Sequence, residues 1–469
     1  MFVILKSPRT GIVLPRKEHI EEEQKGGLNA YSLAGIGIGG VIGAGFFLGS
    51  GLAVREAGPA VSLAFLLGGL VMMQVLGAMA SINVNRLQPG SFRVYAEQFL
   101  GSYTGFLLGW VMFTSSILGI GSEAIAMGVF VHLWLPHLPL PVLATSFTII
   151  IILLNMINMR FFGRIEAGMA AVKVLALLAF IIVGCYVLIT RGAPQVSSPL
   201  SGWHSFFPMG VSGMFQSMLV VIFSYSGIGA VAMAAREVKR PKIEIPEASR
   251  MMSFGSIGLY AISMLVLVMI TPWNSVSLKK SPFVHAFDVI GLDWGAAALN
   301  IVVLLAAFSV MAAAYYASVQ MIVSLSVAKK GPRFFLQHSR NGFYRNAWIA
   351  VAAGVLLVVG MSFLLPSTLY NYLVSASSYF TFLNWTINLI VYLIWKKRRG
   401  QNEAYESKLI WGRPGAYGTI IAILFLFVIS LKVHDFRMGF YAAFALAAVI
   451  SIAYRIWSRE QRRAQRTSG

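Results

Sequence analysis

The sequence predicts an all-α integral membrane protein with twelve transmembrane helices, and three observations lead to this fold class. Hydrophobic residues form 57% of the 469 residues and charged residues only 12%, about half the share that soluble domains carry. Apolar runs of about twenty residues recur along the chain, and each is long enough to cross the hydrocarbon core of a bilayer. Most of the basic residues, finally, fall in segments that would lie on one side of a membrane crossed by these runs.

Each helix is placed by the length and hydropathy of its apolar run. A cytoplasmic tail is expected at 1–27, because its charged residues surround no apolar core of a signal peptide. A single transmembrane domain is expected at 28–457, and a basic cytoplasmic tail at 458–469. Within the domain, the helices are predicted at 30–52, 60–82, 103–132, 141–159, 168–190, 211–235, 252–271, 295–328, 347–365, 373–395, 414–431 and 439–457.

The distribution of the 37 Lys and Arg residues sets the orientation. An even number of helices puts both termini on one side, and most basic residues fall on that side. Cytoplasmic segments carry an excess of Lys and Arg, so both termini are predicted to be cytoplasmic and the chain to lie in the cell membrane. The net charge of +20 is thereby explained without a nucleic-acid partner. The opposite side holds Arg55, Arg191, Lys279, Lys280, Lys432 and Arg437.

The first predicted helix is unusually rich in glycine, at 35, 37, 39, 40, 43, 45, 49 and 51. Glycine costs about 1 kcal/mol against alanine inside a helix, so this density requires a reason. One explanation is close packing, because Gly39–Gly43 and Gly45–Gly49 are pairs of small residues four apart. The other is an unwound stretch whose free backbone groups face a ligand, which membrane proteins tolerate only beside a cavity.

The sixth predicted helix favours the second explanation. Its residues 223–229, FSYSGIG, place hydroxyl groups and glycines at mid-membrane. The first and sixth helices begin two five-helix halves, at about 30–190 and 211–395, and interrupted helices at corresponding positions point to a transporter site. Free N–H groups at the start of a half-helix attract a carboxylate, and free C=O groups attract an ammonium. The predicted ligand is therefore a zwitterionic amino acid.

Two ionisable residues stand out within predicted helices, Glu123 in the third and Lys173 in the fifth. Ionisable residues inside the membrane are candidates for function. Lys173 either snorkels to the headgroups or lies against the broken first helix, where it would replace a bound cation and carry a proton. Glu123 either caps or bridges neighbouring helices or takes part in gating or proton transfer.

Catalytic and cofactor motifs are not found, so no enzyme activity, cofactor or metal site is expected. The sequence has no P-loop, which argues against ATP-driven transport by this chain. It also has no HExxH or GxSxG motif. Its single cysteine, Cys185, lies in an apolar run and cannot form an intramolecular disulfide. The proton motive force is the expected energy source.

Several segments together resemble the amino acid–polyamine–organocation superfamily in its amino acid permease branch. They are residues 39–51 (GGVIGAGFFLGSG), 57–59 (AGP), 90–92 (GSF) with Tyr95, and Glu237 with Pro241 and Ile245-Pro246. The resemblance implies a leucine-transporter type fold, with two inverted five-helix repeats, broken helices 1 and 6, and two extra helices at about 414–457.

The resemblance also implies roles for individual residues. Backbone N–H groups of Gly43, Ala44 and Gly45 would bind the substrate carboxylate. Carbonyls near Phe223, Ser224 and Ser226 would take the amino group. Lys173 would stand where relatives hold a sodium ion, with Glu123 as a second proton-coupling candidate. The full predicted binding set is Ile42, Gly43, Ala44, Gly45, Phe46, Phe223, Ser224, Tyr225, Ser226 and Gly227.

Departures from the branch bear on the substrate. Ala44 stands where a hydroxyl residue is common, and Ala312 and Ala313 stand where Asn-Ser is usual. These changes make the pocket less polar, so the expected function is proton-coupled import of a neutral, apolar amino acid. The alternatives are an amino acid/amine exchanger and a non-transporting amino acid sensor on the same scaffold. The expected partners are the amino acid, protons and the lipid bilayer.

Overall fold

The computed structural model describes residues 28–86, 91–156, 160–191, 201–229, 238–338 and 342–467, with the side chains of 91, 160–167, 191 and 460–467 left out. Within these residues the fold is entirely helical apart from one isolated bridge between Leu28 and Val238. The predicted tail at 1–27 and parts of the predicted helices at 141–159 and 211–235 lie outside the described residues.

Nine helical stretches of the described residues are long and apolar enough to cross a membrane. Two further apolar helices, α2 and α8, are shorter. The helix α17 is not among the nine stretches, but it covers the predicted range 373–395. The first part of the chain forms α2 (Ala30–Val41), α3 (Ala44–Phe47), α4 (Gly49–Ala57), η2 (Gly58–Ala60), α5 (Val61–Asn85), α6 (Ser91–Leu100), α7 (Ser102–His132), α8 (Leu140–Leu154) and α9 (Arg160–Arg191).

The second part begins with the four-residue α10 and continues through longer helices that alternate with short turns. Each of the twelve predicted ranges coincides with one or more helices of the structure. The elements are α10 (Trp203–Phe206), α11 (Gly210–Ser224), η3 (Ser226–Ile228), α13 (Pro241–Ile270), η5 (Trp273–Ser275), α14 (Pro282–Val289), α15 (Asp293–Val327), η6 (Arg333–Leu336), α16 (Arg345–Gly360), η7 (Met361–Phe363), α17 (Leu369–Arg398), α18 (Gly412–Ser430) and α19 (His434–Thr467).

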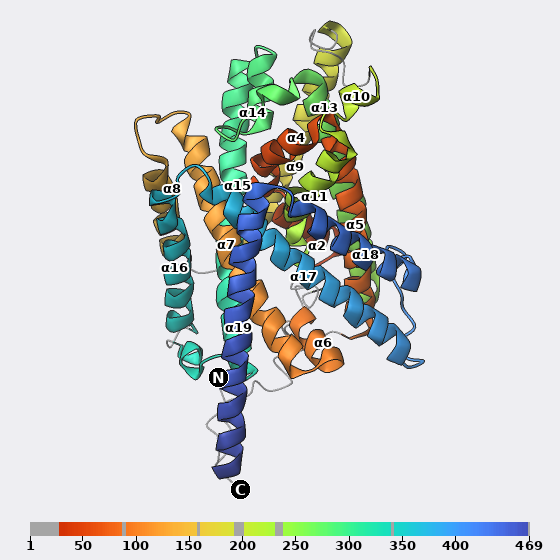
Figure 1. The fold of residues 1–469 in the computed structure, drawn as a ribbon, viewed down its shortest axis with the longest axis vertical. Coiled ribbons are helices and arrows are strands. Elements are labelled where there is room, and N and C mark those ends of the chain that lie inside the picture. The colour runs from red at the N-terminus through yellow and green to blue at the C-terminus, as the bar shows by residue number, and fades with distance from the viewer. Residues whose placement is uncertain are drawn as a thin grey trace.

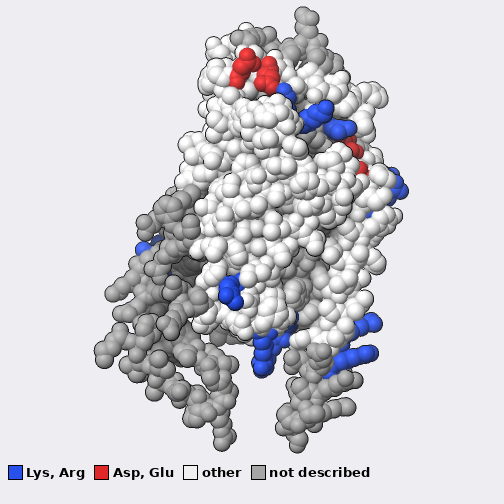
Figure 2. Space-filling model, turned by 90° about the vertical axis from the view of Figure 1, so that its left-hand side faces the viewer, with Lys and Arg blue, Asp and Glu red and all other residues white. Residues whose placement is uncertain are grey.

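Most long helices run roughly along one axis of the molecule, while α17 and α18 cross them obliquely (Figure 1). α7 packs against α15, α17 and α8, while α13 packs against α5 and α2. α7 begins and α19 ends at the same end of the molecule (Figure 1). On one face, a broad uncharged surface separates the charged groups nearer the two ends (Figure 2), as expected for a chain in contact with lipid.

Two of the predicted helices are interrupted where the glycines and serines predicted a break. The first helical run stops at Val41, Ile42 and Gly43 are extended, and α3 begins at Ala44. Leu48 keeps helical angles, so α3 and α4 form one nearly continuous segment. In the sixth range, α11 stops at Ser224 and a 3-10 turn follows Tyr225.

Several elements differ from the predicted ones. The seventh range begins earlier, at Pro241, because proline is well accommodated in the first turn of a helix. The last helix extends to Thr467, through most of the segment predicted as a tail. α6 was not predicted as a helix, because its mixture of charged and apolar residues is too short and too polar for a membrane span.

A buried carboxylate fixes the start of α2. The backbone N–H of Ala30 donates to Glu244 of α13 at 2.6 Å, and Arg240 forms an ion pair with the same side chain at 3.0 Å. The Asn29 side chain also accepts from the N–H of Ser32. Because the first N–H groups of a helix have no partner within it, these acceptors hold α2 against α13.

Candidate functional site

A cavity of about 240 Å³ lies between the two helix breaks. Its wall comes from α2, α3, α7, α11, η3, α15 and α17. The residues on α7 and α17 extend from the breaks toward the end of the molecule where α7 begins. The lining consists of Gly40, Val41, Gly43, Gly45, Met112, Ser115, Ser116, Gly119, Glu123, Phe223, Ser224, Ser226, Gly227, Gly229, Val310, Ala314, Ser377, Phe380, Thr381 and Asn384.

Glu123 reaches from α7 to the start of α3. Its two carboxyl oxygens accept from the backbone N–H of Ala44 at 3.0 and 3.2 Å, and the side chain is only 6% exposed. Gly43 at the N-cap has no side chain to make this bond. A side chain there is also sterically excluded, because a Cβ on Gly43 would lie 2.7 Å from the Glu123 carboxyl. The helix start thus holds an anion supplied by the protein itself.

Lys173 meets the opposite terminus of the first break. Its Nζ donates to the carbonyl of Gly39 at 2.9 Å, and the residue is 1% exposed. A cation near the last carbonyls of a helix interacts favourably with the helix dipole. The ammonium is buried against α2 rather than reaching a headgroup region, and it interacts electrostatically with Glu123.

The sixth-helix break packs directly on the first. Ser224 Oγ donates to the carbonyl of Gly45 at 2.8 Å. Gly227 lies so close to α2 that a Cβ on it would be 2.2 Å from the carbonyl oxygen of Gly40. The ring of Phe223 covers Gly45 equally closely, since a Cβ on Gly45 would be 2.8 Å from two ring carbons. The two breaks therefore form one continuous structure.

The cavity is lined by some of the predicted binding residues and not by others. Gly43, Gly45, Phe223, Ser224, Ser226 and Gly227 line it, whereas Ile42, Ala44, Phe46 and Tyr225 do not. Phe46 instead stacks on Tyr260, with ring centroids 3.7 Å apart. The Tyr225 hydroxyl donates to the carbonyl of Phe65 at 3.0 Å. Ala44 contributes only backbone, and its carbonyl accepts from Tyr370 at 3.1 Å.

Residues of α7 and α17 complete the lining, and of these only Glu123 was predicted. Hydroxyl pairs join α7 to α17 through Ser115 and Ser377 at 2.8 Å, and α7 to α15 through Ser116 and Ser318 at 2.7 Å. The sequence pattern that could have identified these residues is a stripe of small and polar residues at helical spacing. The stripe comprises residues 115, 116, 119 and 123 on α7 and 377, 381 and 384 on α17.

The arrangement offers main-chain groups, hydroxyls and one carboxylate, but no metal site. Among the described residues, no group of three or more His, Cys, Asp or Glu side chains is placed to hold a metal ion. In the described part of the lining, Glu123 is the only ionisable side chain. Such a wall is suited to holding a small polar or zwitterionic molecule by hydrogen bonds.

Comparison with known proteins shows which family the chain is similar to. The family model described as "Amino acid permease" matches residues 33–466. A gamma-aminobutyric acid permease of Bacillus subtilis (strain 168) is 31% identical, covering 91% of this chain and 92% of its own. The aromatic amino acid transport protein AroP of Escherichia coli (strain K12) is 30% identical, covering 92% and 95%. An uncharacterized amino acid permease, YvbW, of Bacillus subtilis (strain 168) is 29% identical, covering 90% and 95%.

Solved structures resemble the chain in fold. A manganese transporter of Eremococcus coleocola superposes with a TM-score of 0.57 at 14% sequence identity, covering 96% of this chain and 97% of that one. At this identity the match concerns the arrangement of helices alone.

Proposed function

Because the chain belongs to the amino acid permease family, we propose that it is a secondary transporter that imports a neutral amino acid together with a proton. The family consists of membrane transporters and not of enzymes. The observation that carries the proposal is the cavity between two interrupted helices, with Glu123 bound to the N–H group at the start of α3.

The proposal includes a membrane topology. Twelve helices cross the cell membrane in a leucine-transporter type arrangement, with two inverted repeats of five and two additional helices. Both termini lie in the cytoplasm, as the placement of Lys and Arg favours. The cavity extends toward the end where α7 begins, so the substrate path in this conformation leads to the cytoplasmic side.

The substrate carboxylate is proposed to bind the N–H groups at Gly43–Gly45. Support comes from Glu123, whose carboxylate is the same chemical group and already accepts from Ala44. The Glu123 side chain therefore stands in for the substrate carboxylate, and substrate has to displace it. The substrate ammonium is proposed to bind carbonyls near Phe223, Ser224 and Ser226, where α11 ends and its last carbonyls lack helical partners.

Displacement of Glu123 supplies a reason for proton coupling. A buried carboxylate that loses its N–H donor is costly to keep charged, unless another group compensates it. We propose that Glu123 takes up a proton as the substrate carboxylate replaces it. Lys173 holds the carbonyl end of α2 in the place that a cation would fill. Displacement of Glu123 thus links the binding of one substrate molecule to the uptake of one proton.

The cavity wall supports a neutral substrate. Apolar groups of Met112, Phe223, Val310 and Phe380 line it together with hydroxyls and the amide of Asn384. A charged substrate side chain would find no opposite charge in this described lining except Glu123. The amino acids in the names of two relatives, aromatic amino acids and gamma-aminobutyric acid, have neutral side chains or none.

A panel of radiolabelled uptake measurements tests the proposed function. The purified chain in proteoliposomes is offered each of the twenty amino acids and gamma-aminobutyric acid, with and without an inward proton gradient. Accumulation of a neutral amino acid only with the gradient supports the proposal. Gradient-independent counterflow with release of a product identifies the exchanger instead. Binding without uptake identifies a non-transporting sensor.

The Glu123→Gln variant tests the coupling step. The amide still accepts from Ala44 but takes up no proton, so substrate binding should lose most of its pH dependence. Gradient-driven accumulation should fall to the level of simple equilibration, while exchange across the membrane continues. Unchanged accumulation with Glu123→Gln would refute the role of Glu123 and leave the substrate site itself in place.

A further inference from the structure

An apolar groove of about 520 Å³ lies between α5, α11 and α18, apart from the cavity at the helix breaks. Its lining is almost entirely aliphatic and aromatic. The one amide, Gln74, is occupied, because it donates to the carbonyl of Leu409 at 3.1 Å and accepts from the N–H of Trp411 at 3.0 Å. The groove is lined by Leu67, Leu70, Val71, Gln74, Phe215, Met218, Trp411, Pro414, Gly415, Gly418, Thr419, Ala422, Phe425 and Leu426.

Small residues on α18 create the space. Gly415, Gly418 and Ala422 follow one another at helical spacing along the groove. A Cβ on Gly418 would meet nothing within 4 Å, so the groove is open there. The neighbouring residues of α18 are large and exposed, with Ile421 at 67% and Val428 at 65%. In a helix that spans a bilayer, such exposed apolar side chains face lipid, and the groove opens among them.

The groove ends in a loop with two exposed cationic residues, while the loop carboxylates Glu403 and Glu406 are paired with Arg86, Lys396 and Arg399. Trp411 is 63% exposed beside Pro414, as is typical of tryptophan at the level of lipid headgroups. Arg413 lies between these two lining residues in the chain, and Lys408 precedes the Gln74-bound Leu409. Both side chains are exposed. An exposed arginine or lysine at a membrane surface attracts anionic lipid.

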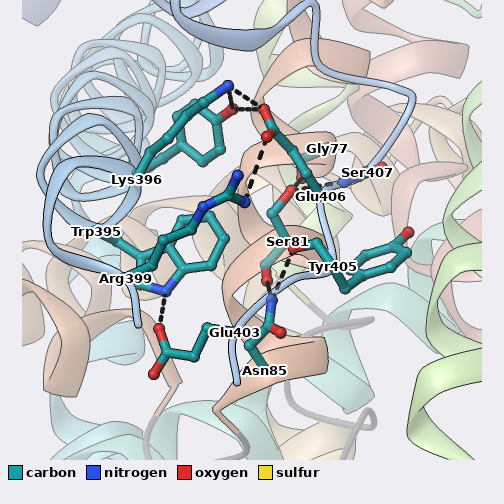
Figure 3. A network of polar contacts seen from close by, with 11 residues as sticks. Gly77, Ser81, Asn85, Trp395, Lys396, Arg399, Glu403, Tyr405, Glu406 and Ser407 are labelled. Atoms are coloured by element: carbon teal, nitrogen blue, oxygen red, sulfur yellow. Dashed lines mark hydrogen bonds and ion pairs between the residues drawn. The ribbon is translucent and has the colours of Figure 1, made fainter. Parts of the chain in front are cut away.

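The loop is held rigidly against α5 by a polar network (Figure 3). Ser81 accepts from the N–H of Ser407 at 2.9 Å, and Asn85 donates to the carbonyl of Tyr405 at 2.8 Å. Gly77 leaves room for the loop backbone, since a Cβ on it would lie 2.6 Å from the nitrogen of Ile410. The charged end and the apolar part of the groove are therefore fixed relative to each other.

We propose that this groove binds an anionic phospholipid, with one acyl chain between α5, α11 and α18 and the phosphate at Arg413. The bilayer supplies the occupant, because the groove opens on the lipid-facing side. The apolar wall accepts the hydrocarbon chain through van der Waals packing, as between apolar surfaces inside a membrane. The positive end selects an anionic headgroup over a zwitterionic one. The site is independent of the proposed transport function.

Native mass spectrometry tests the site with 1-palmitoyl-2-oleoyl phosphatidylglycerol and, as the zwitterionic probe, the matching phosphatidylcholine. The detergent-purified wild-type chain should retain phosphatidylglycerol in preference. Gly418→Phe fills the open part of the groove and should lower its retention several-fold. Ile421→Phe adds a ring of the same kind on α18 outside the groove lining and should retain it as the wild type does.

Arg413→Gln removes a positive charge proposed to bind the headgroup and leaves the apolar wall for the acyl chain intact. This variant should lose most of the preference for phosphatidylglycerol, with Lys408 keeping the rest, which keeps the proposal testable should Gly418→Phe fail to fold. Size-exclusion chromatography and melting temperature identify a misfolded variant. Full phosphatidylglycerol retention by Gly418→Phe, or an unchanged preference in Arg413→Gln, would overturn the proposal. Loss of a dimer in Gly418→Phe with unchanged lipid retention would instead make the groove an interface between copies.

Discussion

Replacing Gly227 by alanine tests whether the two helix breaks must fit together. The Cβ of Gly227→Ala would lie 2.2 Å from the carbonyl oxygen of Gly40 and 2.6 Å from its carbonyl carbon. Ordinary contacts begin at 3.4 Å, so η3 and α2 would have to separate by about 1 Å, because these are backbone atoms with no rotamer to change. The two segments border the cavity on adjacent sides.

The expected cost follows from this misfit. Overpacking a well-packed site costs about 1–3 kcal/mol, which corresponds to about a 5- to 150-fold change in an equilibrium constant. We therefore expect substrate affinity to decrease by about 5- to 150-fold. Affinity is measured by scintillation proximity, with the best amino acid of the uptake panel and purified protein.

A matched control lies two residues away. Gly229 lines the same cavity, but a Cβ on it would meet nothing within 4 Å. Gly229→Ala should change affinity by about twofold or less, as substitutions without steric conflict usually do. Melting temperatures of both variants show whether the fold is kept. Equal affinities of Gly227→Ala and wild type would refute the reasoning that the breaks form one tightly packed site.

Three further predictions concern other contacts. Lys173→Ala should abolish proton-driven uptake in proteoliposomes while leaving binding measurable, and full accumulation by this variant would remove Lys173 from the mechanism. Gly45→Leu should block binding, because even a Cβ would lie 2.8 Å from the Phe223 ring, and unchanged transport would mean that this glycine serves packing alone. Glu406→Gln should lower the melting temperature at neutral pH, because Glu406 loses charged hydrogen bonds worth about 1.5–3 kcal/mol, among them that from Lys396. Burial raises the pKa of Glu406, but the hydrogen bonds from Lys396 and Tyr392 outweigh this effect and hold the pKa below its ordinary value. The stability of the wild type should therefore decline as the pH falls through that lowered pKa. A melting temperature that does not change over this pH range would contradict the prediction.

The sequence predicted the helices well because the membrane imposes a length and an apolar composition on each one. The position of the first break was also predictable, because a run containing Gly43 and Gly45 is a poor helix and its free N–H groups need partners. The second break followed from Ser224, Ser226 and Gly227. These features are local, so the residues themselves carry the signal.

The partners across the cavity were harder to predict. The bond from Ala44 to Glu123 joins residues 79 positions apart, and neither residue alone indicates it. Glu123 was predicted with two alternative roles, and the structure places it at a helix start that also faces the cavity. Phe46 and Tyr225 were predicted in the site from their neighbours, but their rings turn into an aromatic cluster with Tyr260. The sequence predicted the segment in which each ring lies, but not the direction in which the ring points.

An experimental structure with bound substrate, obtained by electron cryo-microscopy with the best amino acid of the panel, tests the central claim most directly. The account predicts that the substrate carboxylate lies within hydrogen-bond distance of the N–H groups at Gly43–Gly45 and that Glu123 has left Ala44. A substrate bound elsewhere, or bound there while Glu123 keeps its bonds to Ala44, would contradict it.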